Sequence, residues 1–128
     1  KGLTIGWFQD QCEFGPRALG HRSILAHPGI EGLGDHINAN IKFREDFRPF
    51  APAVLPEFAE TYFRSGRKSP YMILVDHTTA GYVEQLKNVT HVNGTARVQT
   101  IDKHWNRLFY QLTERFRLIF LPLKQFVS

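Results

Sequence analysis

Apolar residues recur along the chain with two different spacings, which predicts a domain that mixes strands and helices. Short apolar, β-prone runs predict strands over residues 3–8, 23–26, 71–75, 95–101 and 118–121. Apolar residues three and four positions apart, together with turn and cap signals, predict helices over residues 17–20, 30–41, 56–63, 83–87 and 102–116. Because the two kinds of element interleave, we expect a layered α/β domain, or an α+β domain with a mixed sheet.

Three of these elements carry the strongest pattern. Residues 71–75 are expected to be the clearest strand, and residues 3–8 to be a buried one. The best helix follows Asp102, a plausible N-cap, and its apolar stripe consists of Trp105, Leu108, Phe109, Leu112 and Phe116. The proline-rich residues 46–56 must be extended or looped.

Length and composition indicate one domain, over residues 1–128, or a fragment of one. The chain has 128 residues, is 42% hydrophobic and contains 11 Phe, enough for a core. A net charge of +4 favours anionic ligands, whereas nucleic acid is not expected as the main partner. No apolar run reaches the ~20 residues of a membrane span, so no membrane partner is expected. The single cysteine, Cys12, excludes an internal disulfide, favours a cytoplasmic protein, and is expected to be a buried structural thiol.

Common catalytic and metal-binding patterns are missing from the sequence. The six histidines lack the spacing of a zinc site, so we expect no metal site and interpret them as surface or hydrogen-bonded residues. No Walker sequence, dinucleotide fingerprint or nucleophile elbow is present. The glycine-punctuated residues 15–20 could lead into a helix N-terminus, which attracts anions, but alone this signal is weak.

Basic residues in rigid surroundings are the strongest candidates for function. Residues 13–20 and 42–52 place arginine and lysine among aromatic, glycine and proline residues. These neighbours restrict the backbone, and a basic side chain held in this way is suited to binding a phosphate or carboxylate. We expect Lys42, Arg44, Arg48 and Arg97 to converge on one pocket. Arg17 and Arg22 should flank or support it. The alternative is pairing with nearby acids, Arg17 with Glu13, and Arg44 or Arg48 with Glu45 or Asp46.

Two further groups of residues surround these candidates. Thr95, Arg97 and Gln99 are spaced two apart and should share one strand face that lines a pocket, the alternative being an exposed sheet face. The aromatic residues Phe43, Phe47 and Phe50 are expected mostly in the core.

Three segments, residues 6–28, 42–52 and 90–100, closely resemble in order the C-terminal region of the NodU/CmcH/TobZ-type O-carbamoyltransferases. The resemblance covers most of residues 1–117. It implies a YrdC-like domain that makes carbamoyl-adenylate from carbamoyl phosphate and ATP with nucleotide-bound Mg²⁺. It also implies an ASKHA-type N-terminal domain that transfers the carbamoyl group to a hydroxyl. His21, His27 and Asn93 stand where the family pattern has Asn, Asp and Asp.

The resemblance also implies roles for particular residues. Lys42 and Arg44 match the family's Lys-x-Arg motif and are the expected catalytic pair. The expected substrate- and nucleotide-binding residues are Arg17, Arg22, Arg48, Thr95 and Arg97. Residues 117–128 depart from the family and contain no Asn-Thr-Ser-Phe-Asn segment, so we expect a C-terminally truncated, weakly active or inactive chain. The alternatives are a non-catalytic nucleotide- or RNA-binding module and an inactive gene remnant.

Overall fold

The computed structural model describes residues 3–119 and 126–127, and these form an α+β fold of short helices and three small sheets. The strands are β1 (Ile5–Phe8), β2 (Arg22–Leu25), β3 (Pro52–Val54), β4 (Val75–His77), β5 (Thr95–Arg97), β6 (Gln99–Thr100) and β7 (Phe126–Val127). The helices are α1 (Leu33–Ile37), the π-helix η1 (Asn38–Lys42), the 3₁₀ turn η2 (Pro56–Phe58), α2 (Ala59–Tyr62), the 3₁₀ turn η3 (Ala80–Tyr82) and α3 (Arg107–Ile119).

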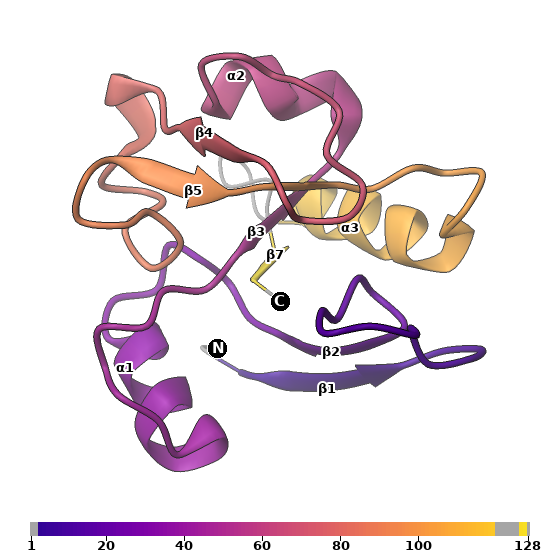
Figure 1. Ribbon diagram of the computed structural model, residues 1–128, viewed down its shortest axis with the longest axis horizontal. Coiled ribbons are helices and arrows are strands. Elements are labelled where there is room, and N and C mark those ends of the chain that lie inside the picture. The colour runs from indigo at the N-terminus through magenta and orange to yellow at the C-terminus, as the bar shows by residue number, and fades with distance from the viewer. Residues whose placement is uncertain (1–2, 120–125, 128) are drawn as a thin grey trace.

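Strand β3 is the centre of the arrangement. It pairs in parallel with β6 and antiparallel with β7, while β1 with β2, and β4 with β5, form two separate antiparallel pairs. In Figure 1 the β4–β5 pair lies on one side of β3 and the β1–β2 pair on the other. Among the described residues, no helix is long and apolar enough to cross a membrane.

Two apolar clusters meet at β3. Val54 packs into the larger one, which includes Tyr62 and Phe63, whereas Ala53 packs into the smaller one with Phe109 of α3. Successive residues of a strand point to opposite faces, so this one strand serves both clusters. Burying each large apolar side chain stabilises the fold by roughly 1.5–3 kcal/mol.

Several sequence predictions are confirmed. The strand expected at residues 23–26 is β2, and the helix expected at residues 30–41 is α1 continued by η1. The helix expected at residues 56–63 is η2 followed by α2. The amphipathic helix is α3, although Leu108 and Trp105 are exposed and Phe109 is the buried member of the stripe.

The expected strand at residues 71–75 is wrong. The strand here, β4, begins only at Val75, and Met72 has a left-handed φ of 53° while donating its N–H to the Ser69 carbonyl. The Met72 side chain is buried, whereas Tyr71 and Ile73 are exposed. An apolar run shows β-propensity, but the fit to the surrounding tertiary structure decides whether a strand forms.

Four smaller expectations also need correction. Strand β1 is mostly exposed, and residues 17–20 form an irregular segment with bends at Arg17 and Gly20 where a helix was expected. Residues 95–101 divide into β5 and β6, which pair in different sheets. Residues 83–87 form turns in place of a helix.

The helix cap and the tail differ from expectation as well. The Asn106 side chain accepts the N–H of Phe109 and caps α3, whereas Asp102 accepts the N–H of His104 in the preceding turn. Helix α3 continues to Ile119, through part of the strand expected at residues 118–121, and residues 120–121 lie outside the described residues. Cys12 is exposed and free, so its expected burial is also wrong.

Candidate functional site: a cavity lined by arginines

Residues 42–48 leave the helical segment through a strained turn. Phe43 ends η1 with a left-handed φ of 46°, a conformation that costs a bulky residue about 1–3 kcal/mol. This turn lets the Arg44 N–H donate to the Asn38 carbonyl at 3.0 Å. The chain therefore doubles back, and Lys42 and Arg44 lie against the same buried Phe50 ring. Lys42 Nζ is 5.3 Å and Arg44 Cζ is 4.8 Å from its centroid.

Asn38 holds this turn in place through hydrogen bonds of its side chain. Its side chain is only 2% exposed; its Oδ1 accepts Arg44 Nε at 2.7 Å, and its Nδ2 donates to the carbonyls of Asp46 and Arg48 at 3.2 and 3.1 Å. One buried amide thus connects the guanidinium of Arg44 with the backbone that carries Arg48. Asn38 was not among the residues expected in the site, and its only signal in the sequence is a polar residue beside Ile37, shortly before the basic segment.

Strand β5 supplies the opposite wall. Thr95 and Arg97 are two residues apart and share a face, with Ala96 buried between them. The pairing of Arg97 with Val75 and of Thr95 with His77 holds β5 against β4. Gln99, expected on the same face, lies beyond the break at Val98, pairs with Ala53 of β3, and donates Nε2 to the Leu19 carbonyl at 2.8 Å.

These walls enclose what we call the arginine cavity, a space of about 350 Å³. Its charged and polar lining consists of Arg44, Arg48, His91, Thr95 and Arg97, and no Asp or Glu lines it. Lys42 is not among the lining residues, but it stands beside them on Phe50. His91, interpreted from sequence as a surface or hydrogen-bonded histidine, is therefore part of the site.

The cations of this cavity repel one another. Burial, followed by Arg44 and Arg48, lowers the pKa of Lys42 from its ordinary 10.5. Burial and Arg48 lower the pKa of Arg44, and Glu45 partly offsets this lowering. Burial, Arg17 and Arg44 lower the pKa of Arg97. Arg17 is therefore close enough to act on the cavity. The guanidinium groups still remain charged at neutral pH.

Local acids do not neutralise this group. The two ion pairs recorded among the described residues join Arg22 with Glu13 and Lys87 with Glu31, so the alternative of pairing Arg44 or Arg48 with Glu45 or Asp46 is not realised there. Several cations kept together without carboxylate partners have the charge and the hydrogen-bond donors that suit an anion with several oxygens, such as a phosphate.

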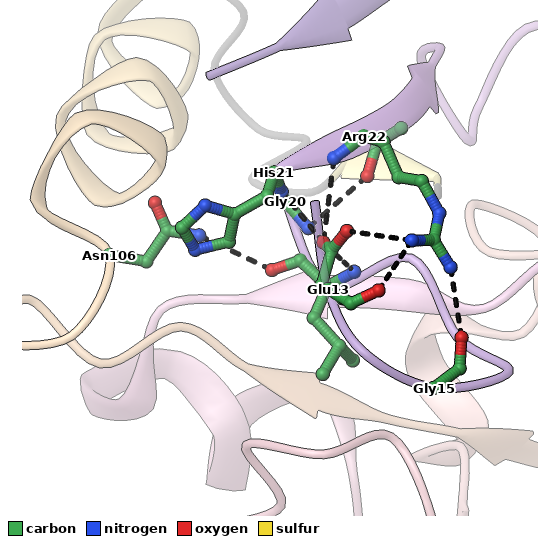
Figure 2. Close-up of polar contacts among 8 residues, drawn as sticks. Glu13, Gly15, Gly20, His21, Arg22 and Asn106 are labelled. Carbon is green, nitrogen blue, oxygen red and sulfur yellow. Dashed lines mark hydrogen bonds and ion pairs between the residues drawn. The ribbon is translucent and has the colours of Figure 1, made fainter. Parts of the chain in front are cut away.

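Arg22 has a different position from the other expected site residues. It donates Nη1 to the Glu13 carbonyl and Nη2 to the Gly15 carbonyl, the latter at 2.9 Å, and Nη1 lies 3.8 Å from Glu13 Oε2. Figure 2 shows its side chain crossing the loop of residues 13–22. Glu13 pairs with Arg22, although the sequence had suggested Arg17 as its alternative partner. Arg22 supports this loop and does not line the arginine cavity.

Glu13 is the anchor of that loop. Its Oε1 accepts the backbone N–H groups of Leu19 and His21 at 2.6 and 2.8 Å, and that of Arg22 at 3.4 Å. Burial alone would raise its pKa, but these hydrogen bonds outweigh burial and the pKa is lowered, so Glu13 is ionised at neutral pH. Gly20 lets the loop pack on α3, because it has a φ of 100° and a Cβ there would collide with the Phe109 side chain.

A metal centre of the usual kind is not built into this part of the chain. Among residues 3–119 and 126–127, no group of three or more His, Cys, Asp or Glu side chains could hold a metal ion. These residues therefore do not fit a protein-held Mg²⁺, and the arginine cavity offers the metal no carboxylate.

Fold and site together define an α+β domain with a cavity lined by arginines. The chain belongs to the family described as carbamoyltransferase C-terminus, whose model matches residues 1–120. The resemblance seen in the sequence is thereby confirmed, and the family places the chain among the transferases.

The chain is also similar to several curated nodulation proteins. The chain is 45% identical over 119 residues to nodulation protein NolNO of Sinorhizobium fredii, covering 91% of this chain and 18% of the relative. It is 43% identical over 120 residues to nodulation protein NolO of Bradyrhizobium diazoefficiens, covering 91% and 22%. Nodulation protein U of Sinorhizobium fredii is 41% identical over 120 residues, covering 93% and 21%. The chain thus spans about a fifth of the length of these relatives.

Proposed function

We propose that this chain is the YrdC-like, carbamoyl-adenylate-forming part of an O-carbamoyltransferase, and that its arginine cavity binds carbamoyl phosphate and ATP. The observation that carries the proposal is the convergence of Arg44, Arg48 and Arg97 on one cavity without a carboxylate in its lining. Membership of the carbamoyltransferase C-terminus family supports the same reaction class. The carbamoyl group would then pass to a hydroxyl on a separate ASKHA-type N-terminal domain.

The proposed chemistry suits a cavity of fixed cations. Water attacks the phosphorus of carbamoyl phosphate, the bond between phosphorus and the carbamate oxygen breaks, and carbamate and phosphate result. A carbamate oxygen then attacks the α-phosphorus of ATP, the bond to the β-phosphate oxygen breaks, and pyrophosphate leaves with the electron pair. Negative charge gathers on phosphate oxygens in both steps, and cations already in place stabilise it.

Individual residues take distinct parts in this proposal. Lys42 and Arg44, held together on Phe50, are the proposed catalytic pair at the reacting phosphate. Arg48, Thr95 and Arg97 bind the phosphate oxygens, and Arg17 adds positive charge from outside the lining. Arg22, proposed from sequence as a binding residue, acts through the Glu13 loop. Mg²⁺ is proposed only as an ion carried on the nucleotide phosphates, and ATP as a substrate that binds reversibly.

The test is pyrophosphate exchange into ATP that depends on carbamoyl phosphate. We expect little exchange from this chain, since it contains no Asn-Thr-Ser-Phe-Asn segment, and clear exchange when the segment is added after α3. Equal exchange by both forms would refute the role of the segment. No exchange by either form, together with no calorimetric binding of pyrophosphate, would refute the proposed function.

Two alternative functions can be tested with the same samples. A nucleotide- or RNA-binding module would bind an RNA duplex with a steep salt dependence, which the net charge of +4 alone does not imply. A gene remnant would lack cooperative unfolding. The cytoplasmic location expected from the single cysteine also stays a prediction, which cell fractionation would check.

A further inference from the structure

A second cavity, separate from the arginine cavity, contains buried polar atoms without partners. Glu13, His21 and Gln99 line it, and among the described residues Glu13 Oε2, His21 Nδ1 and Gln99 Oε1 have no hydrogen-bond partner. We call this space of about 170 Å³ the Glu13 cavity. A buried polar atom left unpaired costs about 1–3 kcal/mol, so three such atoms around one space, without hydrogen-bond partners in the described part of the protein, suit a polar ligand.

Two of these atoms, Glu13 Oε2 and Gln99 Oε1, are hydrogen-bond acceptors held in fixed positions. Gln99 is 3% exposed, and because its Nε2 donates to the Leu19 carbonyl, its Oε1 is left to accept. The Glu13 side chain is 9% exposed, and while its Oε1 accepts backbone N–H groups, its Oε2 accepts none of them. These two residues therefore call for an occupant with at least two donors.

The charge of this cavity is opposite to that of the arginine cavity. Glu13 and Asp102 line it, and neither Lys nor Arg does. Arg22 lies near Glu13 Oε2, but its Nη atoms donate to the carbonyls of Glu13 and Gly15, and it compensates this carboxylate only at 3.8 Å. Figure 2 shows Arg22 on one side of Glu13 and His21 and Asn106 on the other.

Two aromatic rings form the outer wall. Tyr71 and Trp105 line the cavity with their ring centroids 6.0 Å apart and the planes inclined by 33°, and Trp105 is 65% exposed. Aromatic faces attract cations, and a Trp face attracts them most strongly. A carboxylate with unused acceptor capacity beside two such rings is a combination that recognises organic cations.

We propose that the Glu13 cavity binds a small organic cation that carries N–H donors, a primary ammonium or a guanidinium group. The N–H groups donate to Glu13 Oε2 and Gln99 Oε1, and the carbon stem lies against Tyr71 and Trp105. This site is independent of the proposed carbamoyl-adenylate chemistry, because it shares no lining residue with the arginine cavity.

The experiment titrates the chain with methylguanidinium and n-butylammonium chloride at constant ionic strength. Binding is followed by amide and indole N–H shifts in NMR spectra and by calorimetry. Tetramethylammonium serves as a cation without N–H donors, and acetamide as a donor without charge. We expect saturable binding of the first two, with shifts centred on residues 13–21, Gln99 and the Trp105 indole, and at least fivefold weaker binding of the two controls.

Variants test the site without disturbing the fold. Trp105→Ala, at an exposed side chain, should weaken methylguanidinium binding at least fivefold, while Leu108→Ala, at an exposed apolar side chain outside the cavity, should not. Gln99→Met removes one acceptor at similar volume and should have an effect like that of Trp105→Ala. If Gln99→Met unfolds the chain, the ligand series and Trp105→Ala still decide. Equal binding of tetramethylammonium, absence of saturation, or shifts centred elsewhere would overturn the proposal.

Discussion

The arginine cavity and the Glu13 cavity are built from the same short stretch of chain, residues 95–99, and yet carry opposite charge. Among the described residues, Thr95 and Arg97 line the first, whose lining has arginines and no carboxylate, and Gln99 lines the second, whose lining has Glu13 and Asp102 and neither Lys nor Arg. The difference arises at Val98, where the chain leaves the sheet of β4 and joins that of β3. A break in strand pairing thus lets two polar residues at spacing two serve different sites.

The two regions also use arginine differently. Arg22 places both Nη groups on the carbonyls of the Glu13 loop, so its hydrogen-bonding capacity goes into holding that loop. Arg44 is held by Asn38 through Nε, a bond that does not use its Nη groups. An arginine that is fixed through its Nε and stacked on an aromatic ring can use its two Nη groups to bind a ligand. The same residue type is therefore structural in one region and suited to binding in the other.

Arg97→Ala should give the largest loss of activity, and it should affect the arginine cavity without affecting the Glu13 cavity. Carbamoyl-phosphate-dependent exchange, measured in the chain with the added Asn-Thr-Ser-Phe-Asn segment, should fall about 10²–10³-fold, the loss of roughly 2.7–4 kcal/mol of transition-state stabilisation. Methylguanidinium binding should stay unchanged. Arg107→Ala, at an exposed arginine outside both cavities, is the control. An equal loss in both variants would mean that exchange responds to net charge and not to the cavity.

Glu13→Ala should be the most destabilising change in the second region. It removes a charged acceptor from three backbone N–H groups and should lower the free energy of unfolding by about 2–3 kcal/mol in urea titrations. Because its pKa is lowered in the folded chain, its contribution is present above 4.5 and is lost as the pH falls through the lowered value. The variant should therefore show a shallower loss of stability in acid.

A matched acid controls that result. Glu31→Ala breaks an exposed pair with Lys87, and should change the free energy of unfolding by no more than about 1 kcal/mol. Similar effects of the two substitutions would contradict the anchoring role of Glu13.

Asn38→Ala should affect the arginine cavity through its support. Loss of the buried amide removes the contacts to Arg44 and to the carbonyls of Asp46 and Arg48, which should cost about 1–3 kcal/mol of stability and weaken pyrophosphate binding roughly tenfold. Asn40→Ala, at an exposed amide of the same helical segment, should leave both nearly unchanged. Asn38→Asp keeps an acceptor for Arg44, and stable folding with weakened binding in this variant would show a positioning role rather than a purely structural one.

The smallest expected effect is the uptake of protons by Lys42 when pyrophosphate binds. The pKa of Lys42 is lowered by burial, Arg44 and Arg48, and a bound anion offsets these effects, so pyrophosphate binding should take up a proton between the lowered value and 10.5. In the same window the unfolded chain binds more protons, so this residue makes stability rise with pH. Calorimetry in two buffers of different ionisation enthalpy, repeated at a series of pH values up to 10.5, measures the uptake. Lys42→Met should abolish it, and uptake that persists would assign the proton to another group.

Local pattern was enough for several elements and for much of the arginine cavity. The periodic stripe predicted α3, and apolar residues on one helical face predicted α1 with η1 and η2 with α2, because these elements depend on neighbours within one or two turns. The rigid flanks around residues 44–48 indicated arginines with restricted side chains, and the spacing of two along a β-strand predicted that Thr95 and Arg97 share one face. That these segments meet, although about 50 residues separate them, was suggested by the family resemblance together with their rigid flanks, and not by periodicity.

Only the tertiary structure decided which polar atoms remain without partners. The exposed positions of Phe43 and Phe47, expected in the core, and the buried position of Asn38 depend on how the turn at Phe43 folds back. The Glu13 cavity depends on Gln99 meeting Leu19, 80 residues away, and on Asn106 meeting the same loop. Sequence determined which groups this chain can offer. Burial and long-range hydrogen bonding decided which of them are used within the fold and which stay available to a ligand.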